Sequence, residues 1–218
     1  MRRVGPILLL LCCCSDDTEV TCPAVENDLC PGQSTVSVQT QNLVSGAPEE
    51  GVTASAATGE TATSAPNGRL VLCVAAESSA VVTFSKPGFI NTEVEFSGGS
   101  LCAGAPVHTL PIATQAELAT LSETLGITRT AETRTILVSL QTPSGPASSI
   151  QLERPDTFAR GPEGFASSRT PGEDGILMFT TELAPVSVAT QTDLSCSGAT
   201  TVTANRGAIT LMPLLCSQ

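Results

Sequence analysis

Apolar and polar residues alternate along several short stretches of this 218-residue chain, a pattern typical of half-buried β-strands. In the first half we predict strands at 35–39, 52–56, 70–74, 80–84 and 93–96. Turn residues separate these stretches, at 46–48 (GAP), 66–68 (PNG) and 86–89 (KPGF). Strands and turns at this spacing predict a small antiparallel sandwich.

The second half returns to the same pattern after a gap. We predict strands at 135–141, 149–153, 176–180, 185–189, 200–204 and 208–215, with a loop at 161–174. The order matches that of the first half, with a longer loop in place of its middle. We interpret the second half as a diverged copy of the first, although the KPGF turn is missing and 154–174 has no counterpart.

One stretch between the halves has helical rather than strand periodicity. Thr114 and Glu117 have the spacing of a capping box, in which each side chain binds the backbone N–H of the other residue. Three leucines follow on one helical face, at positions 118, 121 and 125, and Gly126 stands where a glycine ends a helix. We expect one helix at 114–125, with its apolar face packed on the second sandwich.

The first half also resembles a known family. Residues 46–52 read G-x-P-x-x-G-V, residues 61–68 follow with T-x-T and a closing glycine, 70–74 is an aliphatic strand, and 84–89 reads F-S-K-P-G-F. In this order the motifs resemble those of a carboxypeptidase regulatory-like domain. The resemblance implies a transthyretin-like (prealbumin-like) β-sandwich whose characteristic residues are structural, with no catalytic residues. The expected fold class is therefore all-β. It consists of two small antiparallel transthyretin-like (Ig-like) sandwiches at 34–104 and 132–218, joined by a connector at 105–131 with one short helix.

The first seventeen residues, MRRVGPILLLLCCCSDD, have the basic, apolar and cleavage regions of an export signal. Because the signal ends on cysteines, it resembles that of a bacterial lipoprotein, which implies a lipid such as palmitate on the new N-terminus. We expect a signal peptide at 1–13 and lipidation at Cys14, which has Leu11 three residues before it. Cys13 is the second choice, and Cys12 is disfavoured because bulky Leu11 precedes it. A plain cleaved secretory signal is the alternative.

The lipid and the signal suggest where the protein lies. The apolar run at 7–11 is far shorter than the roughly 20 residues of a membrane-spanning helix. The lipid is then the contact with the membrane, and residues 14–33 form an acidic, flexible tether. Ser15 follows Cys14, which resembles the sorting signal for the outer membrane. We expect an exported protein that faces the periplasm or the cell surface.

Six cysteines remain beyond the signal, an even number that predicts disulfide bonds in an oxidising compartment. No close CxxC pair is present and there is a single histidine, so we expect no metal and no cofactor. Alignment of the two copies suggests the pairings of the later cysteines. For Cys22 and Cys30 we expect a bond to each other that closes a small loop in the tether. The alternative is that these two cysteines pin the tether to the first sandwich. The predicted pairs are Cys22–Cys30, Cys73–Cys102 and Cys196–Cys216.

Composition narrows the possible partners. Acidic residues outnumber basic ones by 21 to 10, and the only lysine is Lys86, so no basic surface is available for nucleic acid. Trp and Tyr are both absent, which disfavours a sugar site built on stacked rings.

Candidate catalytic and metal residues are few. His108, the only histidine, could act as a base for a serine, but it falls in the connector between two prolines and no G-x-S-x-G motif accompanies it. Glu49, Glu50, Glu93 and Glu95 lack the spacing of a calcium loop and read as solvated acids. We therefore expect no enzyme, although a hydrolase using His108 is a third hypothesis.

These observations favour a lipid-anchored extracytoplasmic β-sandwich protein with a structural or protein-interaction role at a bacterial envelope. The expected partners are the membrane, through the N-terminal lipid, and another envelope protein or a glycan. The alternative is a glycan- or peptide-binding module of a surface assembly, with edge strands and loops as its binding surface.

Overall fold

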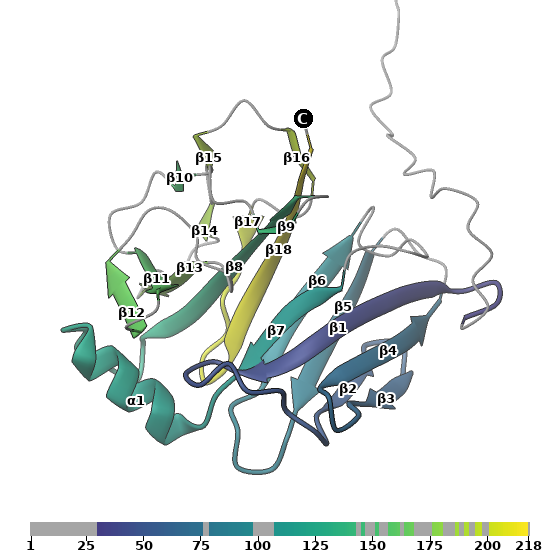
Figure 1. Cartoon of the computed structure of the whole chain (residues 1–218), viewed down its shortest axis with the longest axis horizontal. Coiled ribbons are helices and arrows are strands. Elements are labelled where there is room, and N and C mark those ends of the chain that lie inside the picture. Colours follow the sequence, from purple (N-terminus) through teal and green to yellow (C-terminus); the bar gives the residue numbers. More distant parts are fainter. Residues whose placement is uncertain are drawn as a thin grey trace, which may run out of the picture.

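The structure is a computed structural model that describes residues 30–75, 79–97, 107–142, 145–146, 151–152, 157–161, 164–167, 176–180, 186–187, 190–191, 195–197 and 201–217. These residues form β-strands and one helix (Figure 1). The all-β prediction is confirmed at this level, as a sandwich-like arrangement of sheets.

The first predicted sandwich contains two sheets. Strands β4 (Arg69–Val74), β1 (Ser34–Asn42) and β7 (His108–Ile112) form a three-stranded sheet in that order. The facing strands belong to a larger sheet and follow the order β6 (Thr92–Ser97), β5 (Ser79–Ser85), β2 (Thr53–Ala56) and β3 (Thr61–Thr63). Side chains alternate as period two requires: in β4, Leu70, Leu72 and Val74 are buried, and Val71 between them is exposed.

Strands of the second half extend the larger sheet. From β6 it continues through β18 (Ile209–Ser217), β8 (Arg134–Thr142), β13 (Ile176–Thr180), β11 (Thr157–Gly161) and β12 (Gly164–Ser167). Two strands lie off this path, β9 (Gly145–Pro146) on β8 and β16 (Ser195–Ser197) on β18. The remaining short strands pair as β10 (Gln151–Leu152) with β15 (Thr190–Gln191) and β14 (Val186–Ser187) with β17 (Thr201–Val202).

Strand pairing around β8 repeats the pairing around β1. β1 pairs antiparallel with β4 and parallel with β7, which is the last strand before the helix. β8 pairs antiparallel with β13 and parallel with β18, which is the last strand of the second half. In each half the opening strand therefore lies between an antiparallel and a parallel neighbour.

These parallel pairs correct the expectation of antiparallel sandwiches. The sheets are mixed, because β7 and β18 each enter beside a strand that runs in the same direction. A parallel neighbour requires a long connection. The pattern of single strands predicts where strands form, but it does not predict which strands such connections bring together.

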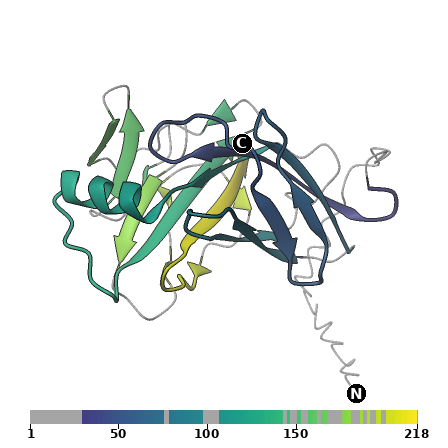
Figure 2. The ribbon, with the colours of Figure 1, turned by 90° about the horizontal axis from the view of Figure 1, so that it is seen from below.

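One strand joins the two halves. β18 pairs with β8 of its own half along Ile209–Leu215 and with β6 of the first half along Ile209–Leu211. Figures 1 and 2 show β18, in yellow, running between the strands of the two halves. The halves thus share a continuous sheet, and the domain limits at 104 and 132 stay a prediction.

The core is continuous across the same junction. Phe84 and Phe96 are fully buried and pack edge to face, with ring centroids 6.4 Å apart. Leu137, Ile209 and Leu211 of the second half belong to the same cluster of buried residues as these rings. This core shows why so few aromatic residues are enough: aliphatic side chains of both halves fill one shared interior.

The predicted helix is confirmed as α1 (Gln115–Thr124). The Thr114 side chain accepts from Glu117 N, and the Glu117 side chain accepts from Thr114 N, as the capping box requires. After the helix, Gly126 N donates to Glu123 O and Ile127 N donates to Ser122 O, with Gly126 at a φ of 72°. Leu118 and Leu121 are buried in the shared core, and Leu125 packs against it.

Several strands lie where we predicted a loop or connector. β11 and β12 form a hairpin in the 154–174 region, of which 161–174 was expected to be a loop, and β7 lies in the expected connector. Pro111 concealed β7, because proline is uncommon in strands. The three-stranded sheet places β7 at its edge, where a missing N–H is tolerated.

Candidate functional site

The predicted lipidation residues lie outside the described residues. Cys14, Cys13 and Cys12 belong to the N-terminal segment that precedes residue 30, and Cys22 and Cys102 also lie outside the described ranges. Lipidation and the roles of these cysteines therefore stay predictions.

Cys73 forms a disulfide with Cys30, and the predicted pairs Cys73–Cys102 and Cys22–Cys30 are both wrong. The reason lies in the register of β1 on β4, which places Thr35 opposite Cys73. A turn from Cys30 to Gln33, closed by the hydrogen bond from Gln33 N to Cys30 O, places Cys30 beside β4, so that the Cα atoms of Cys30 and Cys73 lie 5.4 Å apart. The alternative prediction, that this region is pinned to the first sandwich, describes the bond that Cys30 makes.

Cys196 and Cys216 face each other across an antiparallel pair. They are register partners in β16 and β18. Directly opposed residues of antiparallel strands bring their Cβ atoms within reach of a disulfide. The Cys196–Cys216 bond remains a prediction that this register supports.

His108 is the first residue of β7, a strand that lies within the predicted connector. Its side chain is 1% exposed and packs against Phe96, with ring centroids 5.5 Å apart. Neither imidazole nitrogen has a hydrogen-bond partner. Burial lowers the pKa of His108 to about 4, because the charged form would lose its hydration. An imidazole enclosed in this way cannot reach a substrate, so the geometry does not favour a hydrolase that uses His108.

The four glutamates considered for calcium are dispersed. Glu49 pairs with Lys86, and Glu93 accepts a hydrogen bond from Asn205 Nδ2. No three histidine, cysteine or acidic side chains of the described residues gather in a way that suits a metal ion. Glu49 and Glu93 therefore join elements of the fold to one another.

Lys86 links two of the motifs on which the family resemblance rests. Its ammonium group forms an ion pair with Glu49, from the G-x-P-x-x-G-V motif, and lies 4.9 Å from the centroid of the Phe89 ring. Glu49 O in turn accepts hydrogen bonds from Thr40 Oγ1 and Ser64 Oγ. The two motifs thus meet at one end of the first sandwich, where they have a structural role.

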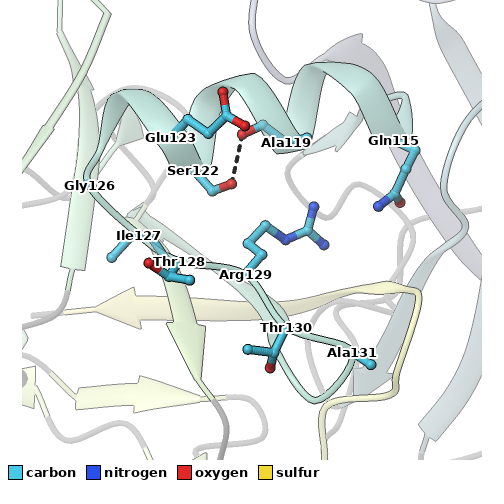
Figure 3. A pocket seen from close by; sticks show the side chains of 10 residues that line it. All are labelled: Gln115, Ala119, Ser122, Glu123, Gly126, Ile127, Thr128, Arg129, Thr130 and Ala131. Atoms are coloured by element: carbon cyan, nitrogen blue, oxygen red, sulfur yellow. Dashed lines mark hydrogen bonds between the residues drawn. The ribbon is translucent and has the colours of Figure 1, made fainter.

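A concave site of the described residues lies elsewhere, between α1 and the segment that follows it (Figure 3). We call it the α1 cleft. Its volume is about 750 Å³, within the range of roughly 300–1,000 Å³ for small-ligand pockets. Its lining residues are Gln115, Ala119, Ser122, Glu123, Gly126, Ile127, Thr128, Arg129, Thr130 and Ala131.

The turn at the end of α1 creates this cleft. Gly126 takes a positive φ, which a side chain would resist, and reverses the chain beneath the helix. The segment 127–131 then runs back under the helix face that carries Gln115, Ala119 and Ser122 (Figure 3). Ser122 Oγ donates to Ala119 O at 2.8 Å, so this hydroxyl is satisfied within the helix.

Arg129 is the cation of the α1 cleft. Its side chain extends into the space between the segment 127–131 and the helix (Figure 3). The Nε atom is buried and has no hydrogen-bond partner, and among the described residues no carboxylate forms an ion pair with this guanidinium. Burial lowers the pKa of Arg129, because the charged form is partly desolvated. The cleft therefore offers an unpaired cation to an anionic ligand.

Arg129 was not among the site residues predicted from the sequence. The signal that was available is its position, four residues after the predicted end of a helix, in a chain with only ten basic residues. A turn that reverses the chain beneath a helix has to be known before an arginine in that turn can be placed in a cleft.

In the part of the chain that the structure describes, no helix combines the length and apolar character needed to cross a bilayer.

Comparisons with known proteins assign no family to this chain. No family model matches the sequence, and no curated protein matches it. Among solved structures, the chain is similar to the one titled "The Bacillus anthracis TIE protein", with a TM-score of 0.30 and 6% sequence identity. That match covers 86% of this chain and 35% of the other. The comparisons therefore assign no family, and the chain is described by its fold class, a mostly β, sandwich-like protein.

Proposed function

We propose that this chain is a lipid-anchored extracytoplasmic protein with a non-catalytic structural or protein-interaction role at a bacterial envelope. The observation that carries the proposal is the Cys30–Cys73 disulfide, placed where the tether meets the first sandwich. Disulfides persist in oxidising compartments, which agrees with an export signal ahead of residue 14. With a lipid on Cys14, the tether and the sandwiches lie on the outer side of the cytoplasmic membrane. Ser15 after the lipidated cysteine favours the outer membrane as the membrane that holds the lipid.

We further propose that both halves are transthyretin-like sandwiches and that the first is a carboxypeptidase regulatory-like domain. Two observations support this. β8 repeats the antiparallel and parallel pairing of β1, which is expected of a duplicated unit. In the first half, the Lys86 contacts with Glu49 and Phe89 give the family-like motifs a structural purpose.

Palmitate labelling tests the anchor. The full chain is expressed in a bacterium that processes lipoproteins and is fed an alkynyl palmitate. We expect labelled protein in the membrane fraction, unchanged labelling in Cys12→Ser, and no labelling in the Cys13→Ser/Cys14→Ser double variant. Labelled double variant would refute the assignment of the anchor, and unlabelled wild type would refute the lipoprotein itself.

A second candidate function is that of a ligand-binding module, for a peptide or another small partner. The observation that favours it is the α1 cleft, with the unpaired Arg129 inside it. The two functions are compatible, because a tethered sandwich can present the cleft to its surroundings.

A further inference from the structure

Arg129 lies in the α1 cleft without the partner that a partly buried guanidinium normally has. Desolvation of a cation is costly and is usually offset by a carboxylate or by hydrogen bonds. Its Nε has neither among the described residues. A ligand that supplies the missing acceptor would recover part of this cost on binding.

The nearby carboxylates do not serve this purpose. Glu123 lines the same cleft but is exposed to solvent and forms no ion pair with Arg129. Glu132, three residues beyond Arg129, forms an ion pair with Arg206. The arginine is thus left available on the side that opens into the cleft.

The shape and charge of the cleft narrow the class of anion. A guanidinium presents parallel N–H groups that match the two oxygens of a carboxylate, and the Gln115 amide on the opposite wall is a further possible donor (Figure 3). Glu123 on the cleft and a net charge of −11 oppose a multiply charged group. The Glu123 carboxylate and the negative net charge therefore favour a ligand with a single carboxylate over a phosphate dianion.

We propose that the α1 cleft binds an organic carboxylate, such as the carboxyl group of a peptide, through Arg129. This inference rests on the second candidate function and specifies its ligand class. The carboxylate lies against the guanidinium, and the rest of the ligand occupies the cleft along α1. Glu123 acts against binding and excludes more highly charged anions.

The test uses phenylglyoxal, which modifies accessible and unpaired arginines, with mass spectrometry of each arginine in the full chain. N-acetylalanine supplies a carboxylate, N-acetylalaninamide is its neutral match, and inorganic phosphate is the competing anion. We expect N-acetylalanine to slow modification of Arg129 several-fold, with no such effect at Arg206. We expect N-acetylalaninamide to have no effect and phosphate to protect less than the carboxylate.

Variants separate binding from structure. Glu123→Gln should strengthen protection by N-acetylalanine, because it removes a like charge from the cleft. Calorimetric titration with the same acid should show affinity reduced about tenfold or more in Arg129→Gln, and a smaller reduction in Arg129→Lys, which keeps the charge but loses the fork. Arg206→Gln, which removes an exposed arginine paired with Glu132, is the matched control and should bind as wild type does.

The proposal is overturned if N-acetylalanine leaves Arg129 modification unchanged, protects Arg206 equally, or protects no better than phosphate. Equal affinity in wild type and a folded Arg129→Gln would overturn it as well. Palmitate labelling does not depend on this cleft, so it should be unchanged in Arg129→Gln. Failure of the carboxylate site is therefore distinguishable from failure of the anchor.

Discussion

Gly68 occupies a position that only glycine fits. Its φ is +76°, and a Cβ there would come closer than 3.0 Å to the carbonyl oxygen of Thr40. Gly68 O also accepts hydrogen bonds from the backbone N–H and the hydroxyl of Thr40, which is fully buried. The turn 66–68, predicted from its residue types, is therefore also a packing contact with β1.

We expect Gly68→Ala to lower the free energy of unfolding by about 3 kcal/mol, from the strained φ and the clash with backbone. Gly88→Ala is the matched control, because Gly88 has a φ of +84° but open space around its Cβ. It should cost about 1 kcal/mol. Urea unfolding monitored by circular dichroism measures both. Equal losses in the two variants would show that the contact with Thr40 is unimportant.

His108 predicts a specific dependence of stability on pH. Its pKa is about 4 in the folded protein and near 6.5 when unfolded, so the unfolded chain takes up the proton first as the pH falls. Stability is fully present above pH 6.5 and is lost between pH 6.5 and 4. From pH 7 to pH 5 we expect a loss of about 2 kcal/mol in the free energy of unfolding.

His108→Leu is the variant that isolates this effect. It should remove most of the loss between pH 7 and pH 5, because an apolar side chain needs no proton. This prediction depends on the burial of His108, which the sequence pattern did not predict. His108 is the only histidine, so NMR titration of its ring protons gives the folded pKa without ambiguity. A midpoint near 6.5 would contradict the prediction.

At the scale of elements, α1 depends on its cap. The Glu117 carboxylate accepts a hydrogen bond from Thr114 N and another from Asn42 Nδ2 at 2.9 Å. The second bond connects the start of the helix to β1. Hydrogen bonding from Thr114 N lowers the pKa of Glu117, so the carboxylate is ionised at neutral pH. The same residue therefore caps the helix and orients it on the sandwich.

We expect Thr114→Ala to destabilise the protein by about 1 kcal/mol, because Glu117 N loses its acceptor. Thr114→Ser retains the hydroxyl and should cost a few tenths at most, roughly the difference between two good caps. Thermal unfolding at fixed protein concentration distinguishes them. Equal midpoints for the alanine and serine variants would mean that the cap contributes nothing.

Some of the secondary-structure elements could be predicted from the sequence and others could not. α1 and the longer strands follow directly from periodicity and turn residues, and they lie where predicted within one to three residues at each end. β3, β7, β11 and β12 were missed, because such strands are specified by their neighbours in the sheet rather than by their own pattern. Pairing between distant strands, such as β18 with β6, has no local signature at all.

At the scale of the molecule, β18 makes the two halves depend on each other. It supplies a neighbour to β6 and to β8, and its Ile209 and Leu211 lie in the core shared with the first half. Two proposed domains joined in this way should unfold as one unit.

We expect a single calorimetric transition whose van't Hoff and calorimetric enthalpies agree. Leu211→Ala should shift this one transition downward, by the equivalent of about 3 kcal/mol for a buried leucine. Hydrogen exchange should then show faster exchange of the amides in β5 as well as in β8. Two separate transitions, of which Leu211→Ala shifts only one, would show that the two halves unfold as independent domains.

The cleft shows where sequence-based prediction of a site stopped. Residues 114–126 predicted the helix and its end, yet the proposed carboxylate site depends on Arg129, which enters the cleft only because the chain reverses at Gly126. Disulfide pairing stopped for a similar reason. Cysteine parity predicted bonds, but the choice of Cys30 for Cys73 follows from strand register.

Disulfide connectivity is testable as a whole. Peptide mapping under non-reducing conditions should recover Cys30–Cys73 and Cys196–Cys216. For the first bond, closure of a 43-residue loop corresponds to about 4 kcal/mol by chain entropy, so Cys30→Ser/Cys73→Ser should lose up to that amount. A Cys73–Cys102 peptide would contradict the register argument.

The position of the Cys30–Cys73 bond also determines how the protein responds to mechanical force. Tension that enters from the N-terminal side reaches Cys30 and crosses the covalent bond to Cys73, so β1, β2 and β3 lie outside the path of the pull. The chain between the cysteines, a sequence separation of 43, then adds no length when the protein is stretched, which hides roughly 150 Å at about 3.5 Å per residue. In a protein held at an envelope by its N-terminus, the segment that carries β1, β2 and β3 could not be extended under load until the bond is reduced.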